Sequence, residues 1–301
     1  MLKESNILAL VGGGKVPYFP PNRLTILDDH QGKIVSQMRF NDNILNVRLR
    51  MDRIIVIFEQ KIYIFNLNTL ETISEIETYP NYSGIIGISN GEDNKLFIAY
   101  PFGFQGCVQI LDCFMQRYEK ISTIPAHDSK LAYLALNKDG KILATASDKG
   151  TIFRIYNVSD GIKLTEFRRG TKNAQINNLC FSPNNKFFAC SSDGGTIHIF
   201  SVIGIMKTIN KDDKNNEDEE EPKNTKNMLG KIGGLLKIKS LEKDRSFTRF
   251  KVQEEYSFVG LGNDNTFVVI TKNGKYYKGA YDPKKGGDCC KIDEKNIFLD
   301  K

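Results

Sequence analysis

Short runs rich in β-branched residues return along this chain at a nearly constant interval. Each run ends in an aromatic residue or a leucine followed by a small polar residue, and the closing positions are Phe65, Leu111, Tyr156 and Phe200. The intervals between these positions are 46, 45 and 44 residues. A fixed period of this length indicates a repeated supersecondary unit, and it constrains the fold more strongly than the composition does.

Each run follows another predicted strand across a turn rich in Asp, Gly or Lys. The clearest turns are Asp-Lys-Gly at 148–150 and Asp-Gly-Gly at 193–195, because glycine tolerates the positive φ angles of tight hairpin turns. Between successive hairpins there is room for an outer strand and the next inner strand. Counting these pairs predicts six hairpins, at 7–28, 53–66, 94–112, 141–157, 185–201 and 264–282.

A four-stranded unit about every 45 residues is typical of a β-propeller blade of the WD-repeat kind. We therefore predict an all-β fold in which residues 1–301 form a single β-propeller domain. The chain contains no tryptophan, but the repeat position needs only a large apolar side chain between neighbouring sheets. Phenylalanine, tyrosine or leucine meets that requirement.

The composition excludes several other classes of protein. Of the 301 residues, 40% are hydrophobic and 26% are charged, which is typical of a globular chain and not of a disordered chain, a collagen or a disulfide scaffold. No apolar run approaches the length of a transmembrane helix, and the N-terminus lacks the apolar core of a secretory signal. We expect a cytoplasmic protein.

Cysteine and histidine show no pattern of a metal or catalytic site. The six cysteines contain no C-x₂-C pair, and the three histidines are widely spaced. Reduced, partly buried thiols are the simplest interpretation. Because there is no cluster of His, Cys and Asp, we predict no cofactor, no metal and no enzymatic activity.

Residues 202–245 form a predicted insertion in the penultimate blade. Loops of this length in a compact domain are usually functional or disordered. The insertion is acidic at 211–221 and amphipathic at 228–241. Residues 211–226 hold seven acids and four lysines, which leaves 38 basic and 29 acidic residues elsewhere and turns the net charge of +6 into +9 for the rest of the chain. A basic body favours an anionic partner, either nucleic acid or a membrane surface.

The amphipathic part of the insertion predicts a membrane-inserting loop. Three glycines weaken a helix there by about 1 kcal/mol each relative to alanine, so we expect helix formation only where the apolar side meets lipid. The alternative is a loop segment that packs on the side of the propeller. The apolar stripe at helical spacing consists of Met228, Leu229, Ile232, Leu235 and Leu236.

The motif Phe167-Arg168-Arg169-Gly170 closes a predicted outer strand. Adjacent residues of a strand point to opposite faces, so the two arginines could serve two separate anion sites. The planar guanidinium suits phosphate because it donates two parallel hydrogen bonds. An Arg-Arg pair alone, however, is more often a solvated strand edge.

Residues 124–157 and 164–202 closely resemble the PROPPIN family, the phosphoinositide-binding propellers typified by the WIPI proteins of autophagy. The stretch LALVGGGKVPYFPPNRLTILDD (8–29) is similar to an early Gly-Gly-Gly…Pro-Pro-Asn segment of that family, nearest to the shorter WIPI subgroup. RSFTRFKV (245–252) and NGKYYKGAYDPKKG (273–286) resemble its last two blades. The resemblance covers nearly the whole chain.

The resemblance implies two neighbouring headgroup pockets, each served by one motif arginine. Hydroxyl, Arg and Lys donors converging on phosphate oxygens are chemically reasonable there, although some of the Ser and Thr residues fit hairpin capping equally well. His198 is interpreted as a structural strand residue. The first pocket would use Arg168, His127, Thr145, Ser147 and Thr151, and the second Arg169, Lys172, Ser191, Ser192 and Thr196.

The family's propellers have seven blades, whereas this sequence predicts six hairpins with only seven residues before the LALVGGG strand. We therefore expect the N-terminal blade to be missing from this sequence, either because the sequence is truncated or because the chain forms an incomplete or rearranged ring. In the family the early blades dock lipid-transfer partners, so this activity is the least safely carried over.

The sequence thus predicts a monomeric effector that binds phosphatidylinositol 3-phosphate and the 3,5-bisphosphate, and that recruits autophagy machinery. It would be peripheral on phagophore, endosomal or vacuolar membranes, with an autophagy lipid-transfer protein as a partner. The alternative is a generic WD-repeat scaffold that binds proteins without lipid. Nucleic-acid binding is not expected, because the basic excess shows no patch interleaved with aromatic residues.

Overall fold

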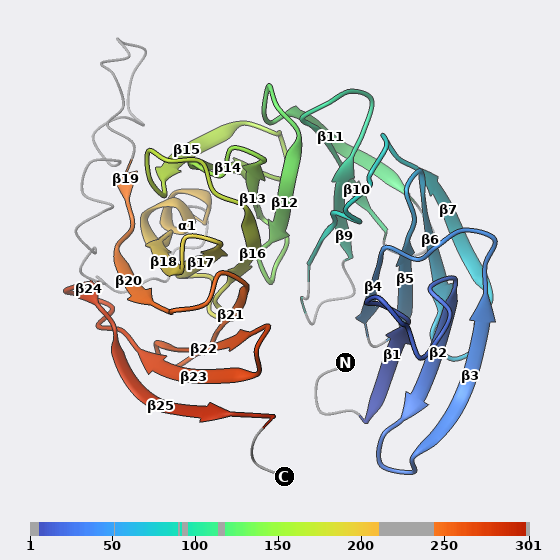
Figure 1. The fold of residues 1–301 in the computed structure, drawn as a ribbon. Coiled ribbons are helices and arrows are strands. Elements are labelled where there is room, and N and C mark those ends of the chain that lie inside the picture. Colours follow the sequence, from blue (N-terminus) through green and yellow to red (C-terminus); the bar gives the residue numbers. More distant parts are fainter. Residues whose placement is uncertain are drawn as a thin grey trace. The chain divides into compact units, whose positions relative to one another are not determined.

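The computed structural model describes residues 6–50, 52–89, 91, 96–113, 118–210 and 244–298 (Figure 1). Within these ranges the chain forms six β-sheets, which we name A to F in chain order, and one short helix. Two compact units are distinguished, one comprising 1–86 with 101–104 and the other 87–100 with 105–301. No helix in the described ranges is long and apolar enough to cross a membrane.

The first unit contains sheets A and B. Sheet A has the strand order β1-β2-β3 and sheet B the order β4-β5-β6-β7, and every neighbouring pair is antiparallel. Their strands are β1 (Ile7–Val11), β2 (Arg23–Asp28), β3 (Lys33–Arg39), β4 (Asn46–Arg50), β5 (Arg53–Ile57), β6 (Lys61–Asn66) and β7 (Thr72–Glu77).

The second unit contains sheets C to F. The inner strand of each sheet contacts the inner strand of the next, from β8 to β12, β16 and β21. Sheets C and D are formed by β8 (Gly87–Ile88), β9 (Phe97–Pro101), β10 (Cys107–Asp112), β11 (Glu119–Pro125), β12 (Leu131–Leu136), β13 (Ile142–Ser147), β14 (Ile152–Asn157), β15 (Lys163–Arg168) and β19 (Asp244–Arg245). Sheets E and F are formed by β16 (Ile176–Phe181), β17 (Phe187–Ser192), β18 (Thr196–Ser201), β20 (Thr248–Lys251), β24 (Gly287–Asp288), β21 (Ser257–Leu261), β22 (Thr266–Thr271), β23 (Lys275–Ala280) and β25 (Cys290–Asn296).

The six predicted hairpins are confirmed as β1–β2, β5–β6, β9–β10, β13–β14, β17–β18 and β22–β23. The four side chains that close the repeated runs are all buried, with exposed fractions of 0–5%. Phe65 and Phe200 belong to apolar clusters between neighbouring sheets, as the repeat position requires. The predicted all-β propeller architecture is therefore confirmed at the level of the sheets.

Two sheets contain a fifth strand that the sequence did not predict. The two-residue strand β19 pairs in parallel with β15, with Arg168 opposite Arg245. The two-residue strand β24 pairs in parallel with β20, with Arg249 opposite Asp288. Each outer strand thus receives a partner from a later part of the chain.

The core of the second unit lies between its sheets. One apolar cluster joins sheets D and E and includes Phe153, Phe167, Phe188 and Phe200, all with an exposed fraction of 0%. A second cluster joins sheets E and F around Phe187 and Phe267. In the first unit, a cluster around Leu24, Ile54 and Phe65 joins sheets A and B. β17 is buried along its whole length because it is covered on both faces.

The predicted insertion at 202–245 begins with structure. Helix α1 (Ile203–Ile209) follows β18, and its buried residues include Ile205 and Met206, which belong to the cluster between sheets D and E. The chain returns to the described structure at β19. The acidic stretch 211–221 and the amphipathic stretch 228–241, with Met228, Leu229, Ile232, Leu235 and Leu236, lie outside the described residues.

Candidate functional site

The Phe-Arg-Arg-Gly motif lies where β15 ends. Phe167 is fully buried, and its ring packs against Phe188 and Phe200 at centroid distances of 5.4 and 5.1 Å. Arg168 is the last residue of β15, Arg169 follows it, and both residues are half-buried. The phenylalanine therefore anchors the motif in the core, and the arginines come at the end of the strand.

The two arginines have different surroundings. Arg169 donates from Nε to the Gly150 carbonyl at 2.7 Å and from Nη2 to the Lys172 carbonyl at 2.5 Å. The guanidinium of Arg168 has no hydrogen-bond or ion-pair partner among the described residues, and neither arginine pairs with a described carboxylate. Partial burial of a charge is unfavourable without a counter-charge, so a bound anion would stabilise this motif.

The turn between β13 and β14 contributes to the setting of Arg169. Gly150 has a φ of +59°, and a β-carbon there would lie 2.0 Å from the Ala174 carbonyl oxygen. Only glycine fits such a close approach without displacing the backbone. The Asp-Lys-Gly turn found in the sequence therefore also brings the Gly150 carbonyl within reach of Arg169.

The first predicted group of residues is brought together in part. His127 and Thr145 are buried, and His127 Nε2 lies 2.9 Å from Thr145 Oγ1. Ser147 and Thr151 flank the β13–β14 turn, and the Thr151 carbonyl accepts a hydrogen bond from the Arg169 amide at 2.9 Å. No hydrogen bond joins any of these side chains to Arg168 in the described part of the chain.

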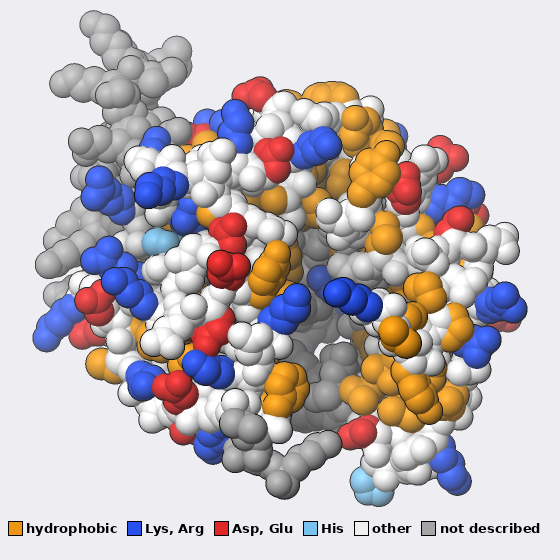
Figure 2. Space-filling view, viewed as in Figure 1, with side chains coloured by type: hydrophobic (Ala, Val, Ile, Leu, Met, Phe, Trp, Pro, Cys, Tyr) orange, Lys and Arg blue, Asp and Glu red, His pale blue; other side chains and the backbone are white. Residues whose placement is uncertain are grey.

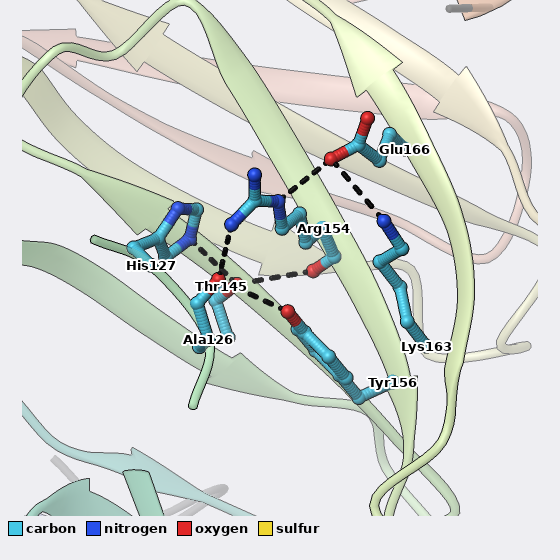
Figure 3. Close-up of polar contacts among 7 residues, drawn as sticks. All are labelled: Ala126, His127, Thr145, Arg154, Tyr156, Lys163 and Glu166. Carbon is cyan, nitrogen blue, oxygen red and sulfur yellow. Dashed lines mark hydrogen bonds and ion pairs between the residues drawn. The ribbon is translucent and has the colours of Figure 1, made fainter. Parts of the chain in front are cut away.

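Two residues beside His127 were missed by sequence reasoning. Arg154 on β14 and Glu166 on β15 stand opposite each other and form an ion pair of 2.6 Å. Arg154 Nη1 also donates to the Ala126 carbonyl at 2.5 Å, directly before His127 (Figure 3). An arginine in the middle of a mostly apolar strand was the available signal, but its meaning depends on which residue faces it across the strands.

The second predicted group places Ser192 and Arg169 around one glycine. A β-carbon on Gly194 would lie 3.5 Å from Ser192 Oγ and 3.6 Å from Arg169 Nη1. Ser192 Oγ is buried and has no hydrogen-bond partner. Buried hydroxyls are normally satisfied, so Ser192 offers an unused donor and acceptor beside the Arg169 guanidinium.

The remaining residues of the second group, Ser191, Lys172 and Thr196, differ in burial and in the residues with which they pair. Ser191 is fully buried, and its hydroxyl donates to the Ser257 carbonyl on β21 at 2.6 Å. This contact ties sheet E to sheet F. Lys172 is exposed, and Thr196 is half-buried at the start of β18, where it pairs with Lys251.

His198 belongs to a basic cluster that the sequence did not predict. His198 Nδ1 lies 3.2 Å from Ser246 Oγ, in agreement with a structural role in the strand. On β20, Arg249 stands opposite His198 in antiparallel register. Burial lowers the pKa of His198, and Arg169 and Arg249 lower it further, so both guanidinium groups lie within electrostatic range of its ring. The register of β20 follows a long insertion and could not be derived from local pattern.

The surface over these strands is basic. Figure 2 shows Lys and Arg side chains gathered over β19 and β20. The exposed basic residues of these two strands are Arg245, Arg249 and Lys251. Arg249 pairs with Asp288 at 3.3 Å, but this ion pair is well exposed to solvent and exposed pairs are weak.

His127, which is buried, and His198, which is half-buried, are both neutral near neutral pH. Burial lowers the pKa of His127 to about 4, and the positive charge of Arg154 contributes in the same direction. Burial also lowers the pKa of His198 to about 4, with further contributions from Arg169 and Arg249. His127 therefore takes up a second proton, and with it a positive charge that could attract an anion, only in acidic solution.

The low pKa values of His127 and His198 should make the folded protein less stable in acid. The unfolded chain protonates histidine near pH 6.5, whereas the folded chain does so near pH 4. Between these values the unfolded state binds more protons, so the free energy of unfolding falls as the pH is lowered, by about 2 kcal/mol per histidine at pH 5. Urea unfolding at pH 7 and pH 5 should show a smaller fall in a His127→Gln/His198→Gln variant than in the wild type. An equal fall in both proteins would contradict this prediction.

No group of three or more His, Cys, Asp or Glu side chains in the described ranges has an arrangement that could hold a metal ion. The residues that come together around β13–β18 are instead arginine, histidine and hydroxyl side chains. This donor set is suited to oxyanions.

Comparison with known proteins gives a consistent result. The family model described as PROPPIN matches residues 9–298. The chain is 34% identical over 300 residues to autophagy-related protein 18e of Arabidopsis thaliana. This match covers 99% of this chain and 75% of the relative. It is 31% identical over 316 residues to WD repeat domain phosphoinositide-interacting protein 1 of Xenopus laevis, covering 99% of this chain and 68% of the relative.

Solved structures with a similar fold include Hsv2 of Kluyveromyces lactis. The match has a TM-score of 0.71 at 20% identity and covers 99% of this chain and 85% of that chain. KlAtg21, solved as a complex with the coiled coil of AgAtg16, matches with a TM-score of 0.73 at 19% identity and coverage of 99% and 84%. At these identities the likeness concerns the fold.

Proposed function

This chain belongs to the PROPPIN family, and from that premise we propose that it is a phosphoinositide-binding effector of autophagy. Its ligands in this proposal are phosphatidylinositol 3-phosphate and the 3,5-bisphosphate. Relatives from a plant and a frog are named as autophagy-related and as phosphoinositide-interacting proteins, respectively. The role we propose is to recognise a marked membrane and recruit autophagy machinery to it, not to catalyse a reaction.

The observation that carries this proposal is the arginine pair without a counter-charge. Arg168 and Arg169 are half-buried at the end of β15, and no described carboxylate neutralises either of them. Structural arginines at such positions are usually paired. Phosphate groups can supply the missing charge and accept two parallel hydrogen bonds from a guanidinium.

Two separate anion sites would act together on one membrane. The first comprises Arg168 with His127, Thr145, Ser147 and Thr151, and the second comprises Arg169 with Lys172, Ser191, Ser192 and Thr196. Neither site needs to be tight, because two linked weak sites raise avidity by about 10²–10⁴ when both can engage. Exposed Arg245, Arg249 and Lys251 add attraction of about 1 kcal/mol each at an anionic surface.

The amphipathic stretch 228–241 completes the membrane attachment in this proposal, although it lies outside the described residues. Its apolar side would enter the lipid layer once headgroups are bound. The protein would then be a cytoplasmic, monomeric chain that attaches peripherally to phagophore, endosomal or vacuolar membranes. An autophagy lipid-transfer protein is the partner we propose for it there.

Vesicle flotation with the unmodified protein tests this function. We expect the protein to float with phosphatidylcholine vesicles that contain phosphatidylinositol 3-phosphate, and to remain at the bottom with vesicles of phosphatidylcholine and phosphatidylinositol. Binding should weaken as salt is added, because exposed charges are screened. If the protein floats with no phosphoinositide vesicle, and if deletion of 228–241 does not change this result, the alternative of a scaffold that binds only proteins is supported.

A further inference from the structure

Arg154 is held by two contacts on different elements. Its Nε donates to Glu166 Oε2 at 2.6 Å, and its Nη1 donates to the Ala126 carbonyl at 2.5 Å (Figure 3). Glu166 lies opposite Arg154 across β14 and β15, and Lys163 adds a second cation at 3.6 Å from the same carboxylate oxygen. The guanidinium therefore has a fixed orientation between the sheet and the segment that leads into His127.

The main chain at Ala126 and His127 is fixed from two sides. The Ala126 carbonyl accepts hydrogen bonds from Arg154 Nη1 and from the Tyr156 hydroxyl, the latter at 3.0 Å. The amides of Ala126 and His127 both donate to the Gly106 carbonyl at 3.0 Å. Arg154 and Tyr156 thus hold one face of this segment from β14, and the position of the His127 ring depends on them.

The hydrogen bonds of Thr145 select a tautomer of His127. Thr145 Oγ1 lies 2.9 Å from His127 Nε2 and 3.3 Å from the main-chain carbonyl of Arg154. The hydroxyl has one hydrogen, and the Arg154 carbonyl can only accept it. Both contacts are satisfied together when Thr145 donates to that carbonyl and accepts from a hydrogen on His127 Nε2. Nδ1 is then a bare acceptor, and Figure 3 shows this nitrogen without a contact among the residues drawn.

Burial, together with the nearby charge of Arg154, keeps the His127 ring neutral. Burial and the Arg154 guanidinium lower its pKa, whereas hydrogen bonding at Thr145 and the charges of Glu166 and Asp128 act in the opposite direction and do not outweigh them. A neutral ring with the hydrogen on Nε2 cannot donate from Nδ1 to an anionic phosphate oxygen. It can accept a hydrogen bond from a hydroxyl group.

We propose that Arg154 is a positioning residue of the first pocket, which holds His127 so that Nδ1 accepts a hydrogen bond from a hydroxyl of the inositol ring. This inference rests on the proposed function, because it assigns a role within the same headgroup site. His127 thereby recognises a position of the inositol ring that carries a hydroxyl group and no phosphate, while the arginines bind the phosphates. The first pocket thus distinguishes inositol phosphates by a free hydroxyl as well as by charge.

Nitrogen NMR of the His127 ring tests the tautomer and the role of Arg154. In the full chain at pH 7, with the signal assigned from His127→Gln, we expect the hydrogen on Nε2. Arg154→Met should raise the pKa of His127, because it removes a nearby positive charge. Arg154→Lys should keep that pKa low, because the positive charge remains. It should nevertheless bind soluble inositol 1,3-bisphosphate roughly 10-fold more weakly, because one ammonium group cannot replace the planar guanidinium that donates to both Glu166 and the Ala126 carbonyl.

A second measurement addresses the hydroxyl directly. Inositol 1,3-bisphosphate and its single-deoxy analogues are titrated against the wild type and His127→Phe. One analogue should bind the wild type about 5- to 10-fold more weakly, as expected for one lost hydrogen bond. The same analogue should cost His127→Phe little beyond the effect of the substitution. Thermal unfolding establishes that each variant is folded.

The matched control is Arg53→Met, which removes a partly buried arginine paired with Asp52 at 2.9 Å in sheet B. It should change neither the pKa of His127 nor the affinity. A hydrogen on Nδ1, or deoxy analogues whose losses are identical in the wild type and His127→Phe, would overturn the inference while vesicle binding by the wild type persists. Failure of the wild type to bind any phosphoinositide vesicle would instead refute the proposed function itself.

Discussion

Replacement of both Arg168 and Arg169 by threonine is expected to abolish detectable binding to phosphoinositide vesicles. A hydrogen bond to a charged group contributes about 1.5–3 kcal/mol, so the loss at one site weakens binding by roughly 10- to 100-fold. The loss at both sites also removes the avidity of linked binding. Threonine is β-branched and suits the end of a strand, so the fold should persist.

Flotation with vesicles that contain phosphatidylinositol 3-phosphate measures this effect. Each single substitution should give intermediate binding, since one site remains. The control is Arg23→Thr/Arg39→Thr, which removes two arginines that face each other across β2 and β3 in sheet A. This control lowers the net charge equally and should bind almost normally. Binding of the Arg168→Thr/Arg169→Thr protein at the wild-type level would show that the motif does not hold the headgroups.

The second large effect concerns the core between sheets D and E. The Phe188 ring is fully buried and lies 4.8 Å from that of Phe200 and 5.4 Å from that of Phe167. Phe188→Ala should lower the free energy of unfolding by about 3–5 kcal/mol, because it removes apolar contacts and leaves a cavity. A loss of this size is a large fraction of the stability of a typical domain.

Urea unfolding provides the measurement, and Phe258→Ala provides a matched control. Phe258 lies on β21 with 58% of its surface exposed, so its truncation should change the free energy of unfolding by no more than about 0.5 kcal/mol. If the two variants unfold at the same urea concentration, Phe188 does not have the role in the core assigned to it. Because Phe167 packs on Phe188, the core variant should also weaken headgroup binding.

The sheets could be predicted because their signals are local. A hairpin needs two alternating runs and a turn, and all three are adjacent in the sequence. Strands that pair over long separations left no such signal: β19 and β24 have two residues each and join β15 and β20 in parallel. Helix α1 was overlooked because it is only seven residues long and begins inside a segment interpreted as a loop.

The candidate site was predictable only as far as the motif and the family resemblance reach. Arg168 and Arg169 were located by their sequence, but the partners of each hydroxyl depend on tertiary contacts. Ser191 and Ser192 are neighbours in sequence, yet one hydroxyl bonds the Ser257 carbonyl and the other is buried without a partner. Arg154 was missed because its role depends on the positions of Ala126 and Glu166, which no local pattern gives.

Because β19 and β24 lie late in the sequence, the strands with which they pair, β15 and β20, have an unpaired edge during part of translation. Sheet D receives its fifth strand only at residues 244–245, and sheet E receives its own only at 287–288. A nascent chain that has emerged only as far as residue 243 presents β15 with an open edge, which other chains can pair with. The outer edge of β15, the strand that carries Arg168, therefore gains its partner only after more than seventy further residues have been synthesised. Until then, the edge of β15 that later pairs with β19 is open to pairing with another chain.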